Sequence, residues 1–73
     1  MDEYDLQNID FIIYCVETYK ERKGLDGKTA YNKLKVAGAI NYIDKNYEAL
    51  HTFSDNNIMW NIAEYINSHN TRS

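Results

Sequence analysis

The residues that could carry chemistry in this chain are few and widely separated. The side chains most suited to bind a metal ion or act as a nucleophile are one cysteine and two histidines: Cys15, His51 and His69. They are isolated from one another in the sequence, without the spacing of a metal-binding pair. Metal sites need clustered ligands, so no metal is expected. Cys15 falls on the apolar side of a predicted helix, close to Glu17, which favours a neutral buried thiol over a thiolate. The sequence therefore predicts no catalytic residue, no metal ion and no cofactor.

Two further features resemble functional motifs. Gly27-Lys28-Thr29 is similar to the end of a phosphate-binding loop, but no strand precedes it and the glycine spacing is incomplete. Asp26 would also repel a phosphate there, so we interpret the triplet as a helix start with Asp26 as its N-cap. His51 ends a predicted helix, where its ring can bond a loop carbonyl or interact with the helix dipole, which makes it a structural polar residue.

The elements that must position these residues are predicted to be helices. Apolar residues recur at helical spacing in four segments, and glycines fall between the first three. Asn46 marks a place where the third segment can break. We therefore expect an all-α bundle of about four helices, two longer outer ones and two shorter middle ones. The segments are about 6–23, 27–37, 39–51 and 55–69.

The inward faces follow from the same spacing. The first segment carries a stripe that includes Ile9, Ile12, Ile13, Val16 and Tyr19, and it should face the core. In the second segment we expect three inward residues, and the third carries an apolar stripe of its own. The three expected inward residues are Ala30, Tyr31 and Leu34.

Length and composition exclude several classes of protein. The chain has 73 residues, 44% hydrophobic residues, one cysteine and a net charge of −3. This predicts a single helical domain over 1–73, with 1–5 and 70–73 frayed. The acidic start does not resemble a signal peptide, and no run approaches the ~20 apolar residues of a membrane helix. A cytoplasmic protein without a membrane span is expected.

Charge is unevenly distributed along the chain. Residues 1–19 carry a net charge of −5, residues 20–35 carry +4 and residues 36–73 carry −2. Lys28, Lys33 and Lys35 in the basic stretch are candidate partner-binding residues. They also allow an alternative, a small nucleic-acid-binding regulator. Asp44 and Glu48 on the would-be reading helix would repel phosphates, so nucleic-acid binding is disfavoured.

Aromatic residues exceed what so small a core can hold, with seven Tyr, two Phe and one Trp. Trp60, Tyr42 and Tyr14 fall off the apolar stripes of their helices, so some of these rings should face outward. Tyr and Trp dominate the energetics of many interfaces. We therefore take Trp60, Tyr42 and Tyr14 as candidate partner-binding residues, against the alternative that they only cover the edges of the bundle.

A set of residues between about 8 and 67 carries a resemblance to a known family. The Leu-His-Thr triplet at 50–52 is its most distinctive element. The chain resembles short bacterial proteins grouped as a domain of unknown function, usually encoded beside an ADP-ribosyltransferase-like protein. It departs from that pattern after the triplet, where Phe53-Ser54-Asp55 replaces a small glycine-containing link. The matching residues are Ile9-Asp10-Phe11, Cys15, Glu17, Tyr19, Gly27, Ala30-Tyr31, Gly38, Tyr42-Ile43, Tyr47, Leu50-His51-Thr52, Ile62 and Tyr65-Ile66.

The resemblance implies an antitoxin-like or accessory protein that binds and restrains the neighbouring transferase-like protein. Such a role agrees with the expectation of a non-enzymatic protein–protein interaction module, drawn from the missing catalytic constellation and the surplus of aromatic residues. Two alternatives stay open: the nucleic-acid-binding regulator, and a self-associating domain, including a homodimer that buries an exposed apolar face.

Overall fold

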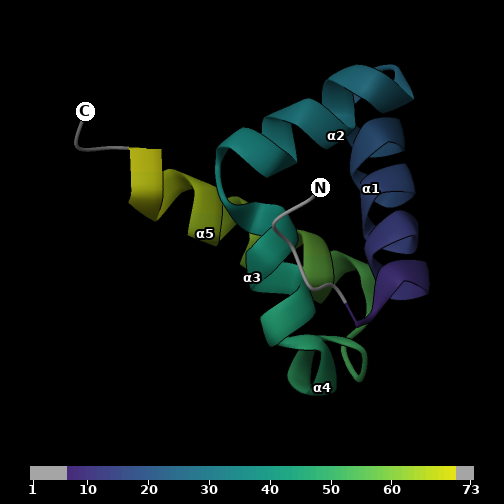
Figure 1. The fold of residues 1–73 in the computed structure, drawn as a ribbon, viewed down its shortest axis with the longest axis vertical. Coiled ribbons are helices and arrows are strands. Elements are labelled where there is room, and N and C mark those ends of the chain that lie inside the picture. The colour runs from purple at the N-terminus through teal and green to yellow at the C-terminus, as the bar shows by residue number, and fades with distance from the viewer. Residues whose placement is uncertain (1–6, 71–73) are drawn as a thin grey trace.

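The computed structural model describes residues 7–70, with side chains through residue 68, and every regular element in that range is a helix (Figure 1). The all-α prediction is confirmed. The two longest helices are the first and the last, as expected, and the fraying expected at 1–5 and 71–73 lies outside the described residues. Asn70, also expected to fray, ends the last helix. The elements are α1 (Ile9–Lys23), α2 (Gly27–Val36), α3 (Ala39–Lys45), α4 (Tyr47–Leu50) and α5 (Asp55–Asn70).

The helix boundaries follow from local hydrogen bonding. Asp26 is the N-cap of α2, and its carboxylate accepts from the Thr29 backbone N–H at 2.8 Å, as predicted. Gly24 ends α1 in the left-handed conformation with φ of 65°. Gly38 takes the same conformation with φ of 82° in the turn from α2 to α3. At each of these helix ends the bond or dihedral angle involved is local in sequence.

The segment predicted over 39–51 is two short helices rather than one. It breaks at Asn46, the residue identified from the sequence, where φ of −109° departs from helical geometry. The Asn46 side-chain amide donates to the Tyr42 carbonyl at 2.9 Å. Asparagine competes in this way for backbone groups, which weakens a helix at that position. The break lets α4 change direction and bring Leu50 into the core.

One hydrophobic core joins all five helices. On α1 the buried positions are Ile12, Cys15, Val16 and Tyr19, a helical stripe with spacings of three, one and three. The other helices contribute eight buried residues, most of them aliphatic, and a further set of partly buried hydrophobic residues packs around this cluster. These eight are Ala30, Leu34, Ala39, Ile40, Ile43, Leu50, Ile58 and Ile62.

The structure corrects three of the expected inward residues. Ile9 and Ile13 are about half exposed, because the buried stripe of α1 is centred on the face of Ile12 and Val16. Tyr31 is also exposed, because Ala30 and Leu34 take the inward face of α2. In each case the sequence pattern was wider than the face that the neighbouring helices cover.

The arrangement of the helices leaves one end of the bundle open. Helices α1, α2 and α3 pack against one another, and α5 packs against α1 and α3. The C-terminal turns of α5 project beyond the rest of the bundle (Figure 1). Within residues 7–70, no helix combines the length and the hydropathy that a bilayer crossing requires.

Candidate protein-binding surface

Cys15 has the surroundings of a core residue. Its side chain is fully buried, and burial raises the pKa of the thiol to about 12. At neutral pH the sulfur is therefore a protonated, shielded group and a poor nucleophile. Among the side chains that the structure describes, no three His, Cys, Asp or Glu residues are placed to hold a metal ion.

The Gly27-Lys28-Thr29 triplet begins α2. Asp26 accepts the hydrogen bond that a phosphate would take from the Thr29 backbone N–H. The Thr29 side chain, and then this backbone bond, lower the pKa of the Asp26 carboxyl. The negative charge at this helix start comes from the chain itself. The triplet caps and begins a helix, as interpreted from the sequence.

His51 follows α4 and is exposed. Its Nδ1 donates to the Tyr47 carbonyl at 2.8 Å, and its ring stacks on the Tyr47 ring with centroids 4.5 Å apart. The row of rings continues from Tyr47 to Phe11 at 5.2 Å and from Phe11 to Tyr14 at 6.1 Å. These contacts tie the α4 turn to α1 and agree with a structural role for His51.

Asp44, which sequence analysis treated only as a charge that repels phosphate, anchors the residues before α1. Its carboxylate accepts from the backbone N–H groups of Gln7 and Asn8 at 3.1 and 2.9 Å, and from the Asn8 side chain. Asn8 thus bonds to α3 instead of capping α1 with its side chain. The partners are 36 residues or more apart, so nothing in the local sequence signals this contact.

The three candidate aromatic residues lie in different surroundings. Trp60 is 62% exposed and Tyr14 is 42% exposed, as predicted, although the Tyr14 hydroxyl donates to the Asp55 carboxylate at the start of α5. Tyr42 differs from the expectation: it is half-buried and its ring stacks on Tyr65 at 4.4 Å. No contact unites the three rings in the described part of the chain, so they do not form one patch.

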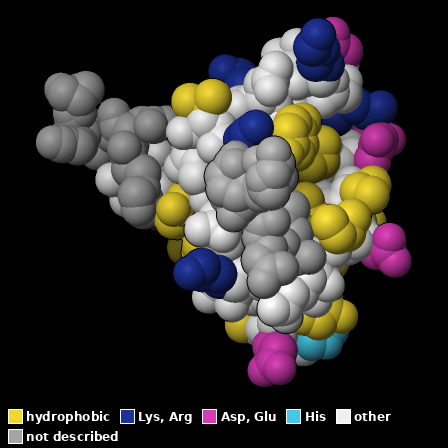
Figure 2. All heavy atoms as spheres, viewed as in Figure 1, with side chains coloured by type: hydrophobic (Ala, Val, Ile, Leu, Met, Phe, Trp, Pro, Cys, Tyr) yellow, Lys and Arg dark blue, Asp and Glu magenta, His cyan; other side chains and the backbone are white. Residues whose placement is uncertain are grey.

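The three candidate lysines are exposed side chains of α2: Lys28, Lys33 and Lys35. Within residues 7–68, the ion pair found joins Lys20 to Glu17, and none of the three α2 lysines is paired. On the face in Figure 2, basic side chains lie around α2, with acidic side chains both beside them and on the α1 side. Of the acidic stretch, the structure describes Asp10 and Glu17 on α1, and the last turn of the same helix carries basic residues.

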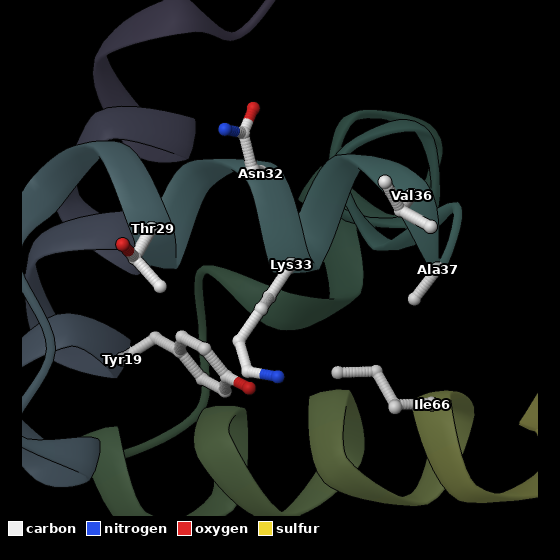
Figure 3. Close-up of a pocket in the computed structure, with 7 residues that line it drawn as sticks. All are labelled: Tyr19, Thr29, Asn32, Lys33, Val36, Ala37 and Ile66. Carbon is white, nitrogen blue, oxygen red and sulfur yellow. The ribbon is translucent and has the colours of Figure 1, made fainter.

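An open groove of about 430 Å³ lies between α2 and the later turns of α5 (Figure 3). Tyr19 of α1 forms its base, while Val36 and Ala37 line one side and Ile66 lines the other. Lys33 extends from α2 into the groove beside the Tyr19 ring, as Figure 3 shows. Of the six candidate partner-binding residues, Lys33 is the one that lines this groove.

Sequence reasoning missed Val36, the most exposed large hydrophobic side chain of the described residues at 87%. A signal was present, because Val36 is a β-branched apolar residue on a face of α2 that otherwise carries polar side chains. The other apolar groove residues gave no such signal. Ile66 continues the inward stripe of its helix, and its partial exposure depends on where the neighbouring helices stop.

Comparison with known proteins yields a family but no activity. A family model described as a protein of unknown function (DUF3791) matches residues 10–69, which is most of the chain. No curated protein and no solved structure matches. The family match covers all five helices, the Leu50-His51-Thr52 triplet and the groove between α2 and α5. The chain belongs to the DUF3791 family.

Proposed function

We propose that this chain is a non-enzymatic protein–protein interaction module that acts in the cytosol as an antitoxin-like or accessory protein. It binds and restrains an ADP-ribosyltransferase-like protein encoded beside it. The observation that carries the proposal is the exposure of large hydrophobic side chains on a chain of 73 residues, above all Trp60 and Val36. Exposed large apolar and aromatic side chains are typical of the residues that dominate the energy of protein interfaces.

The chemistry of the described side chains supports binding over catalysis. The buried Cys15 thiol is protected by its raised pKa, and His51 is engaged by Tyr47. The exposed lysines of α2, which pair with no described carboxylate, would steer association with an acidic partner. The named partner comes from the family resemblance, through the usual position of the gene.

Co-purification tests this proposal. The tagged chain is expressed in its own host and retained proteins are identified by mass spectrometry, with and without nuclease. We expect the transferase-like neighbour to be retained after nuclease treatment and at about 0.5 M salt, because an apolar interface loses little affinity when charges are screened. Trp60→Ala should weaken retention, whereas Trp60→Phe should keep most of it.

The nucleic-acid alternative predicts the opposite salt dependence. Phosphate contacts weaken steeply as salt rises, and the triple substitution of Lys28, Lys33 and Lys35 by Glu would abolish them. The short length of the would-be reading helix counts against this alternative, because α3 has only seven residues. Retention of nucleic acid alone would nevertheless replace the proposal.

A further inference from the structure

The groove between α2 and α5 is a continuation of the core that no part of residues 7–68 fills. On α5, Ile58 and Ile62 are buried, and Ile66 follows one turn later on the same face but is only partly covered. The base of the groove is the ring of Tyr19, itself a core residue. An apolar stripe that runs past the end of its own bundle is typical of a surface that packs against another helix.

The α2 side of the groove has helical periodicity of its own. The α2 residues that line the groove are spaced by three, one and three residues, so they lie along one side of the helix: Thr29, Asn32, Lys33 and Val36. In Figure 3, Lys33 points from α2 toward the Tyr19 ring, whereas Asn32 points away from it. A groove walled by two helices accepts a third helix through apolar side chains at positions three and four apart.

Charge indicates which helix fits. Lys33 enters the groove and pairs with no carboxylate of the described side chains, and it lies in the stretch of net charge +4. A lysine stem packs well along apolar surface while its ammonium group meets an acid at the rim. In an isologous contact between two copies of this chain, the basic faces of two α2 helices would meet, and like charges would oppose that arrangement.

We propose that this groove binds an amphipathic helix of a partner protein, whose apolar residues contact Val36, Tyr19 and Ile66 and whose carboxylate pairs with Lys33. This inference deepens the proposed function. It rests on that function because it takes the natural occupant of the groove to be a protein. It names the binding surface and the chemistry of the segment that the partner supplies: apolar on one face and acidic at its edge.

A peptide titration tests the groove without the natural partner. The probes are three synthetic peptides of about 14 residues, roughly 21 Å long as helices. The first has leucines on one helical face and glutamates on the other, the second is its scrambled form, and the third has lysine in place of glutamate. Binding to the ¹⁵N-labelled chain is followed by NMR, and we expect the first peptide alone to cause saturable shifts at the amides of Val36, Ala37 and Ile66.

Matched variants separate the groove from general electrostatics. Lys33→Glu and Lys35→Glu change the net charge equally on the same helix, but Lys35 does not line the groove. We expect Lys33→Glu and Val36→Asp to raise Kd at least about tenfold, and Lys35→Glu to raise it less than about threefold. All three residues are exposed, so unchanged circular dichroism spectra should show that the variants still fold.

Each other outcome overturns the inference. Absence of binding, equal binding of the scrambled peptide, shifts centred elsewhere, or equal effects of the two lysine variants would remove the groove as the site. Sedimentation that shows a dimer of the unmodified chain and a monomer of Val36→Asp would assign the groove to a second copy. The transferase-like protein is absent from the peptide titration. A negative titration therefore does not change the co-purification result, and a negative co-purification does not change the titration result.

Discussion

The two faces of α2 differ in what covers them. One face places Ala30 and Leu34 fully inside the core, and the other presents Lys33 and an 87% exposed Val36 to an open groove. Both faces carry apolar side chains on one helix of ten residues. The hydrophobicity of a side chain therefore does not by itself decide whether that side chain is buried. The position of α1 and α3 against the first face, and the divergence of α5 from the second, decide it.

Breaking the covered face should have the largest effect. We expect Leu34→Ala to lower the free energy of unfolding by about 2–5 kcal/mol, because it removes a fully buried side chain and leaves a cavity. A domain of this size has little more stability than that. Urea unfolding followed by circular dichroism measures the loss, and a change below about 1 kcal/mol would contradict the assignment of Leu34 to a sealed core.

The turn at Gly38, between α2 and α3, should be the next most sensitive place. We expect Gly38→Ala to destabilise the chain by about 1–3 kcal/mol, because a left-handed φ of 82° is unfavourable for alanine. The added Cβ would also lie 3.2 Å from the Tyr65 hydroxyl. Thermal unfolding measures the effect. Gly27→Ala is the control, since Gly27 is helical and its nearest neighbour would be 3.9 Å away; equal losses in both variants would contradict the explanation.

The sealed core should also show itself in the pH dependence of stability. Burial raises the pKa of the Cys15 thiol to about 12, whereas an unfolded cysteine titrates near ~8.5. Above that lower value the unfolded chain loses a proton that the folded chain keeps, so stability falls as pH rises. Between about pH 8 and about pH 10 we expect this fall to be about 1–2 kcal/mol larger in the unmodified chain than in Cys15→Ala. Parallel urea unfolding curves measure it, and identical pH dependence would show that the thiol is accessible.

The open face should tolerate substitution. We expect Val36→Ser to change the free energy of unfolding by less than about 0.5 kcal/mol, because little of the side chain contacts the folded chain. The same variant should lose affinity for the acidic amphipathic peptide. Calorimetric unfolding measures the change in stability, and the peptide titration measures the change in affinity. Strong destabilisation by Val36→Ser would mean that the residue belongs to the fold and not to a binding surface.

Features that depend on neighbouring residues were predictable. The caps at Asp26 and Gly38, the break at Asn46 and the exposure of Trp60 were all identified from local pattern. Asp26 and Asn46 act through a side chain bonded to a backbone group within four residues, Gly38 acts through the left-handed φ that glycine allows, and the exposure of Trp60 follows from the helical period. The core was predicted in outline, with errors at Ile9, Ile13 and Tyr31, because periodicity gives the direction of a face and not the width that its neighbours cover.

The sequence alone was enough to predict an all-helical chain and the places where its helices begin and break. These properties are set by short-range hydrogen bonds and by the spacing of apolar residues. Only the tertiary structure decided that Asp44 holds Gln7 and Asn8, that Tyr42 is covered by Tyr65, and that Val36 and Ile66 flank an open groove. Those contacts join residues more than 20 positions apart, and they exist because of how far each helix extends past its neighbours.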